Sequence, residues 1–335
     1  MKRHGNLYGR ITEADNLMEA YRRARRGKTA KSAIKRFDQN PEERLVKIRQ
    51  TLVDQTFKTS EYSSKWILEP KPRQIYVLPF APDRIVQHAL MNVIEPIWDD
   101  LLISDSYACR VGKGIHAGSR RCMEFVRRYK YCLKCDISKF YPSVDHDVLF
   151  DVIQRKIKCP ETLWLIKEII YSMPGGKNVP IGNYTSQWFG NLYMNELDQY
   201  LKHEWRIKPY IRYCDDFVSF SDDKRFLNEV ADAIKEYCAD RLKLRLSKCD
   251  LFPVNQGVDF LGYRHFPNFI LLRKSTSRRV KKRLALLPSL LAKGRISLDS
   301  YRSSIASTNG WLKWANSHHL GLSLKLEELA SVSAA

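Results

Sequence analysis

The chain has 335 residues, enough to bury a substantial core, and 44% of them are hydrophobic, which excludes an intrinsically disordered protein. Lys and Arg number 57 against 37 Asp and Glu, and the net charge of +20 favours a polyanionic partner, nucleic acid before an anionic membrane surface. The apolar stretches are short and interrupted by charge, so we expect no membrane span, no secretory signal and a cytoplasmic location. The eight irregularly spaced cysteines are typical of reduced thiols rather than of a disulfide framework or a zinc site.

The N-terminal part predicts helices followed by a cationic hairpin. Residues 15–58 have helical spacing, with Gly27 as a plausible stop, and the arginines of "NLMEAYRRARRGK" face either solvent or RNA. Two short strands flank "EPKPR", so Lys71 and Arg73 lie at a hairpin tip. A helix then begins near residue 83, with Arg84 and Gln87 on one face. These cations are either ordinary surface charges or a clamp on a triphosphate.

The middle of the chain contains a strand that ends in an acid, and a polar loop. "YKYCLKCDI" alternates like a strand over 131–137, which places Asp136 near the strand end. The loop "GGKNVPIGNYTSQ" leads into an apolar helix that Thr185 or Ser186 would cap. We expect the polar side chains at its mouth to be free to touch a ligand: Asn183, Ser186 and Gln187.

The segment "IRYCDDFVSF" places Asp215 and Asp216 together between two apolar strands. Burying a carboxylate costs several kcal/mol unless a positive charge compensates it, so the pair indicates either a tight turn or a metal site. The C-terminal region is basic and helical. We expect Val280, Leu284, Leu287 and Leu291 to form its inner face, and Gly310 to precede a further helix.

A strand-end acid and a distant Asp-Asp hairpin are typical of a two-metal phosphoryl-transfer site. In this interpretation Asp136 and Asp215 bridge two Mg²⁺ ions, with Mn²⁺ as an alternative. Asp216 is either a secondary ligand or tunes the electric field of the site, and the Ile137 carbonyl adds an oxygen. One ion activates a 3′-hydroxyl and the other holds the triphosphate.

These motifs, in their order, resemble those of reverse transcriptases. "RYCDDFVSF" is similar to the family's Y-x-D-D motif, "LKCDISKFYPSVDH" to its first aspartate motif, and "EPKPRQIYVLPFAPDRIVQHAL" to its fingers motifs. The resemblance implies an α+β right-hand polymerase fold. Its domains would be fingers over 1–105, a palm with an antiparallel sheet over 106–268 (with a fingers insertion near 145–182), and a helical, basic thumb over 269–335.

Within the family, the loop "IGNYTSQ" has Ser-Gln where group II intron and retroviral enzymes usually have a Q-G sequence. This resembles the reverse transcriptases of diversity-generating retroelements, bacterial and phage systems that copy a template RNA into mutated cDNA. The resemblance implies errors opposite template adenines and a small, basic, helical accessory protein.

The resemblance also implies roles for single residues. Lys71 and Arg73 would contact the phosphates of the dNTP, and Tyr141 would select deoxyribose. Lys248 would be the general acid for pyrophosphate. The floor beside base and sugar would consist of Ile181, Gly182, Ser186 and Gln187. Leu261, Gly262 and Tyr263 would hold the primer end, and the basic stretch 278–283 would bind the RNA–DNA duplex.

Three other readings stay open. A retron or group II intron-like reverse transcriptase in phage defence is the nearest alternative. A nucleotide cyclase would lack its G-G-D-E-F motif, and a catalytically inactive nucleic-acid-binding protein would have kept all three aspartates without need.

Overall fold

The computed structural model describes residues 3–68 and 71–330, so part of the predicted hairpin tip lies outside the described residues. The chain divides into two units. The first comprises residues 1–110, 136–208 and 232–248, and the second comprises residues 111–135, 209–231 and 249–335. The predicted α+β class with antiparallel sheets is confirmed. Within the described ranges, every helix is too short or too polar to cross a bilayer.

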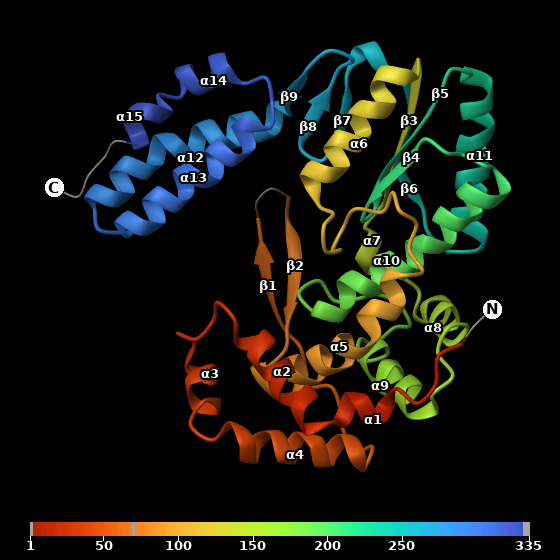
Figure 1. Cartoon of the computed structure of the whole chain (residues 1–335), viewed down its shortest axis with the longest axis vertical. Helices are drawn as coiled ribbons and strands as arrows, with labels where there is room; N and C mark the ends of the chain where they lie inside the picture. Colours follow the sequence, from red (N-terminus) through yellow and green to blue (C-terminus); the bar gives the residue numbers. More distant parts are fainter. Residues whose placement is uncertain (1–2, 69–70, 331–335) are drawn as a thin grey trace. The chain divides into compact units, whose positions relative to one another are not determined.

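The first unit is mostly helical, and Figure 1 shows the hairpin of β1 and β2 beside α2 and α5. The predicted helical region 15–58 is interrupted, because α2 stops before Gly27, which has a φ of +70°. The elements are α1 (Tyr8–Thr12), α2 (Ala14–Arg25), α3 (Ser32–Phe37), α4 (Pro41–Val53), β1 (Ser63–Ile67), β2 (Arg73–Val77), the π-helical turn η1 (Phe80–Arg84), α5 (Ile85–Asp99), α7 (Phe140–Ser143), α8 (His146–Gln154), α9 (Pro160–Ile170), α10 (Tyr184–Gln199) and η2 (Tyr200–Glu204). The helix α11 (Lys224–Asp240) begins in the second unit and ends in the first.

Two helices form the centre of the first unit. The helix α5 is apolar on most of its faces and is therefore buried. Near its end, the ring centre of Trp98 lies 5.8 Å from the ring centre of Phe189 on α10. The predicted apolar stripe of α10 is buried as expected. Burial of this stripe fixes the helix, and with it the loop that leads into α10.

The second unit contains two sheets and a helical end. A four-stranded sheet has the order β4-β5-β3-β6, and a three-stranded antiparallel sheet has the order β7-β8-β9. The unit boundary runs through β3 after Cys135 and through β6 after Lys248. The elements are α6 (Ile115–Arg128), β3 (Tyr131–Ile137), β4 (Tyr210–Tyr213), β5 (Asp216–Ser221), β6 (Leu246–Pro253), the 3-10 turn η3 (Val254–Gln256), β7 (Val258–Phe260), β8 (Tyr263–His265), β9 (Ile270–Leu272), α12 (Lys274–Ala292), α13 (Leu298–Lys313), α14 (His318–Ser323) and α15 (Leu326–Ala330).

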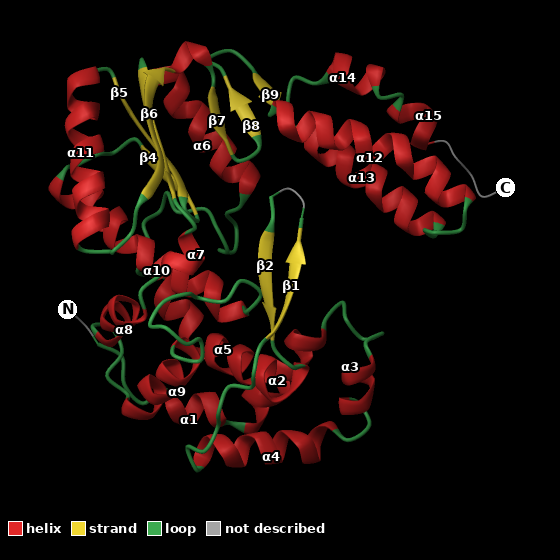
Figure 2. Cartoon of the chain, turned by 180° about the vertical axis from the view of Figure 1, so that it is seen from behind, coloured by secondary structure: helices red, strands yellow, loops and turns green. Residues whose placement is uncertain are grey.

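The helices α12 and α13 lie side by side (Figure 2). As predicted, Leu284 and Leu287 are buried in this contact, and Val280 and Leu291 pack against it. The prediction that Gly310 precedes a helix is wrong, because Gly310 lies inside α13. The apolar contacts of α13 offset the roughly 1 kcal/mol that a helical glycine costs.

Candidate active site

The Asp-Asp pair occupies a tight turn with a buried cation close by. The strands β4 and β5 pair with Tyr213 opposite Asp216, so Cys214 and Asp215 form a two-residue turn in which Cys214 has a φ of +56°. Arg212 is 0% exposed, and its Nη1 donates to the Cys214 carbonyl at 3.0 Å. The pair therefore lies at the predicted hairpin turn, which leaves the metal-site interpretation untested, and the buried Arg212 lies beside the turn.

A second cation pairs directly with Asp216. Nζ of Lys134 on β3 lies 3.1 Å from Oδ1 and 3.3 Å from Oδ2 of Asp216. It also donates to the Asp259 carbonyl and lies 6.0 Å from the ring centre of Phe260. The side chains of Lys134 and Asp216 are only 14% and 24% exposed, so the pair is largely shielded from solvent. Lys134 had no predicted role, although the alternation of β3 placed it on the same face as Asp136.

Asp136 is half-buried at the end of β3 in the first unit. Its Oδ2 accepts a 2.6 Å hydrogen bond from Oγ of Ser247, which also lies 3.1 Å from the Asp136 carbonyl. Two residues after Asp136, the backbone amide of Ser138 donates to the Arg245 carbonyl at 2.8 Å. The start of β6 thus fixes the carboxylate. Ser247 lies in "KLRLSKCD", beside the predicted general acid Lys248, which is exposed.

The three aspartates belong to different units, Asp136 to the first and Asp215 and Asp216 to the second, while the sheet order makes β3 the neighbour of β5. Within residues 3–68 and 71–330, no three His, Cys, Asp or Glu side chains are arranged to hold a metal ion. The donor set nevertheless suits Mg²⁺ or Mn²⁺, because carboxylates and the Ile137 carbonyl are hard oxygen ligands. The Asp216 carboxylate is paired with Lys134, so a metal ion there would share this carboxylate with the lysine. The metal assignment stays a prediction.

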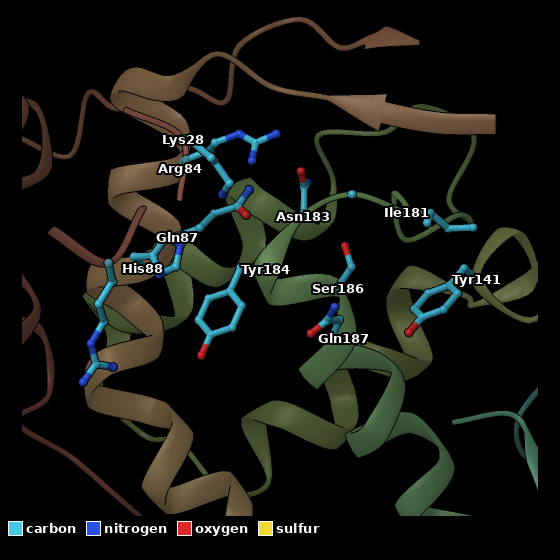
Figure 3. Close-up of a pocket in the computed structure, with 12 residues that line it drawn as sticks. Lys28, Arg84, Gln87, His88, Tyr141, Ile181, Asn183, Tyr184, Ser186 and Gln187 are labelled. Carbon is cyan, nitrogen blue, oxygen red and sulfur yellow. The ribbon is translucent and has the colours of Figure 1, made fainter. Parts of the chain in front are cut away.

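A pocket of about 290 Å³ opens in the first unit (Figure 3). Most of the residues predicted to contact the nucleotide line it, whereas Lys71 and Arg73 on the exposed hairpin do not. The predicted residues among the lining are Arg84, Tyr141, Ile181, Gly182, Ser186 and Gln187, and the others are Arg23, Lys28, Gln87, His88, Asn183 and Tyr184.

One wall of the pocket joins β2 to the loop before α10. The Tyr76 amide donates to the Ile181 carbonyl at 2.8 Å. Gly182 follows with a φ of +126°, and a Cβ there would lie 2.3 Å from the Tyr76 carbonyl oxygen. Only glycine lets the backbone at position 182 lie this close to Tyr76, so sterics exclude any other residue there.

The predicted helix cap is wrong. The helix α10 begins at Tyr184, so Asn183 holds the cap position, where its side chain makes no capping bond and instead donates to the Tyr62 hydroxyl at 2.9 Å. The Ser186 hydroxyl is buried and donates to the Pro180 carbonyl at 2.7 Å. Asn183 and Ser186 therefore shape the loop, and of the three polar side chains expected to be free only Gln187 is exposed.

Tyr141 lies on the short helix α7 beside α10. A Cβ at Gly190 would lie 3.2 Å from the Tyr141 ring and 3.0 Å from the ring of Phe140. The glycine therefore lets both rings approach α10, and the Tyr141 ring lines the pocket.

The side of the pocket near α2 and α5 is cationic and aromatic. Sequence reasoning singled out Arg84 and Gln87 here but gave no role to His88 or Tyr184. His88 stacks on Tyr184 with ring centres 4.6 Å apart. Burial, assisted by Lys28, Arg23 and Arg84, lowers the pKa of His88 to about 4, so the imidazole is neutral at pH 7. Burial and then Arg84 lower the pKa of Lys28. The signal for Arg23 and Lys28 was the basic run in "NLMEAYRRARRGK", whose RNA-facing reading was one of two alternatives.

The predicted primer-holding residues form a second tight hairpin. Leu261 and Gly262 connect β7 to β8 with φ values of +56° and +85°. A Cβ at Gly262 would lie 2.9 Å from Trp311, on whose ring Tyr263 stacks with centres 5.2 Å apart. The turn is thus fixed against α13, while the basic residues in 278–283 are exposed on α12.

Comparison with known proteins agrees with these motifs. The chain is 26% identical to Protein YkfC of Escherichia coli K12 over 66% of this chain and 72% of that protein. It is 22% identical to the group II intron-encoded protein LtrA of Lactococcus lactis over 72% of this chain and 53% of LtrA, so it spans about half of that relative. The sequence model of the family described as reverse transcriptase (RNA-dependent DNA polymerase) matches residues 67–265, more than half of the chain. The protein therefore belongs to the reverse transcriptase family of RNA-directed DNA polymerases.

Proposed function

We propose that the protein copies a template RNA into error-prone, adenine-mutated cDNA as the reverse transcriptase of a diversity-generating retroelement. The observation that carries this proposal is the loop "IGNYTSQ", which has Ser186 and Gln187 in place of a Q-G sequence and lines the pocket. Selectivity against wrong base pairs depends on contacts beside base and sugar, so the loop is the place where fidelity would change.

Asp136, Asp215 and Asp216, with the Ile137 carbonyl, would hold two divalent ions. When bound, the ions supply the positive charge that activates the primer 3′-hydroxyl and stabilises the leaving pyrophosphate. The chain supports the acids through Ser247, which donates to Asp136. Lys248 would donate a proton to the pyrophosphate.

The incoming dNTP would be held by the hairpin and the loop. Lys71 and Arg73 are exposed near the hairpin tip, where long cationic side chains are free to reach phosphates. Tyr141 would oppose a ribose 2′-hydroxyl, because its ring is fixed at the pocket wall by α10. The exposed basic face of α12 would bind the RNA–DNA duplex, and a small basic helical protein would assist.

Sequencing of the cDNA tests this proposal. The purified protein would extend a primer on an RNA template with Mg²⁺ and dNTPs, alone and with a small, basic, helical accessory protein of such a retroelement. We expect substitutions concentrated opposite template adenines, and no cDNA from the D215N/D216N variant. Errors spread evenly over the four template bases in both reactions would contradict the retroelement assignment.

The second candidate is an accurate group II intron-like or retron reverse transcriptase in phage defence. The similarity to LtrA over 72% of this chain favours it. It predicts cDNA with few, evenly distributed errors, so the same sequencing experiment separates the two candidates.

A further inference from the structure

We propose that Cys135 and Cys249 form a reversible disulfide when a peroxide reaches the protein, and that this bond slows primer extension. Cys135 lies on β3 and Cys249 on β6, which are neighbours in the four-stranded sheet. Both cysteines belong to the second unit, and both are thiols in the structure. This site of modification goes beyond the proposed function, and only its effect on extension depends on the proposed role of Asp136.

The first observation is the distance between the two sulfur atoms. Sγ of Cys135 lies 3.6 Å from Sγ of Cys249, although the two residues are 114 positions apart in the chain. One position further along β3, Asp136 contacts Ser247, which lies two positions earlier on β6, so the strands are antiparallel here. Opposed residues of antiparallel strands have Cα atoms about 4.5–5.5 Å apart, which is within the range that a disulfide accepts.

The second observation is a difference in access to solvent. Cys249 is partly exposed, whereas Cys135 is 0% exposed. A small oxidant can therefore reach Cys249 first, while the Cys135 sulfur lies close enough to react with the oxidised group. An accessible thiol beside a second, resolving thiol is typical of redox-sensing cysteines. Burial raises the pKa of the Cys122 and Cys132 thiols, which makes these two thiols poor competitors for the oxidant.

The oxidation takes place in two steps. The Cys249 sulfur attacks an oxygen of hydrogen peroxide, the S–O bond forms as the O–O bond breaks, and one water leaves with the thiol proton, which gives a sulfenic acid. The Cys135 sulfur then attacks the Cys249 sulfur, the S–S bond forms as the S–O bond breaks, and a second water leaves with the Cys135 proton. Two thiols are thus oxidised to one disulfide, and one peroxide is reduced to two waters. A small dithiol reverses the oxidation by thiol–disulfide exchange.

The disulfide would act on the proposed metal ligand Asp136 through its neighbours in the chain. Cys135 precedes Asp136, and Cys249 lies two positions after Ser247, whose hydroxyl donates to the Asp136 carboxylate at 2.6 Å. A disulfide needs sulfur atoms about 2.05 Å apart and Cβ atoms about 3.8 Å apart, whereas opposed strand residues keep their Cβ atoms about 4.5–5.5 Å apart. Both strands must therefore shift locally, and a displacement of about 1 Å in a catalytic group can lower a rate by about a hundredfold.

Peroxide treatment of the full-length protein tests the proposal. The protein would be treated with hydrogen peroxide, its remaining thiols would be blocked with iodoacetamide, and its digested peptides would be analysed by mass spectrometry with and without dithiothreitol. We expect a peptide pair joined through Cys135 and Cys249, which dithiothreitol separates. After removal of the peroxide, the joined protein should extend a primer on an RNA template at least about tenfold more slowly, and dithiothreitol should restore the rate.

Cys249→Ser should keep its extension rate after peroxide treatment, because it cannot form the bond, and an unchanged melting temperature would show that it is folded. Cys109→Ser is the matched control, since it removes an exposed thiol and should leave the peroxide sensitivity of the wild type. Recovery of Cys135 and Cys249 as alkylated thiols, once Cys109 is oxidised, would overturn the proposal. Equal inactivation of Cys249→Ser would also overturn it and would assign the effect to another thiol, such as Cys214 in the Asp-Asp turn. A protein that forms the bond but extends no primer before oxidation would instead refute the proposed function.

Discussion

The ion pair between Lys134 and Asp216 should stabilise the fold measurably, and a double-mutant cycle of Lys134→Met and Asp216→Asn isolates its contribution. At 3.1 Å, with an effective dielectric constant of about 20, the attraction is about 5 kcal/mol before desolvation. Desolvation and the ordering of the lysine side chain offset most of this energy. Because both side chains are less than a quarter exposed, we expect a net coupling of about 1–3 kcal/mol, above the range of surface pairs.

The free energy of unfolding of the wild type, both single variants and the double variant would be measured by guanidinium denaturation at pH 7. The pair Lys235–Asp232 is the control, since it has a similar separation of 2.8 Å but side chains that are 55% and 77% exposed. Its cycle should give less than about 0.5 kcal/mol. A coupling for Lys134 and Asp216 no larger than the control's would refute the reasoning that burial strengthens this pair.

Three further predictions concern the pocket. Gly182→Ala should lower the free energy of unfolding by about 2–4 kcal/mol in denaturation experiments, because its Cβ would collide with the Tyr76 carbonyl, whereas Gly9→Ala, with open space around it, should be nearly neutral. The pKa of His88 is lowered to about 4, below its unfolded value near 6.5, so the unfolded state binds more protons between these values and stability should fall as the pH falls from 6.5 to 4. NMR titration should find His88 neutral at pH 6, and a normal pKa would contradict its burial among cations. Tyr141→Ala should raise incorporation of rNTP relative to dNTP by about tenfold in single-nucleotide extension assays, and unchanged discrimination would remove Tyr141 from the sugar-selecting role.

The local features of the fold could be predicted from the sequence. The strand around Asp136, the Asp-Asp hairpin and the inner face of α12 follow from short-range alternation or helical spacing, and the structure has all three. Asn183 and Gly310 show where such reasoning fails. A helix start depends on which bonds a polar side chain makes to distant residues, and a glycine is tolerated in a helix when its neighbours pack well.

The partners of the candidate site were beyond prediction because they come from distant parts of the chain. Lys134 meets Asp216 across 82 positions, and Ser247 meets Asp136 across 111. Lys28 follows α2, which packs on α5, and its side chain lines the pocket. Charge and spacing indicate that such residues carry function, but the pairing of strands and helices decides which of them meet.

Primer extension on an RNA template is the most direct test of the central claim that Asp136, Asp215 and Asp216 act together in DNA synthesis. The wild type should extend the primer in the presence of Mg²⁺. Asp136→Asn and the D215N/D216N variant should each lose activity by roughly a thousandfold or more while binding the primed template with unchanged affinity. Normal extension by either variant, with the protein folded, would contradict the account.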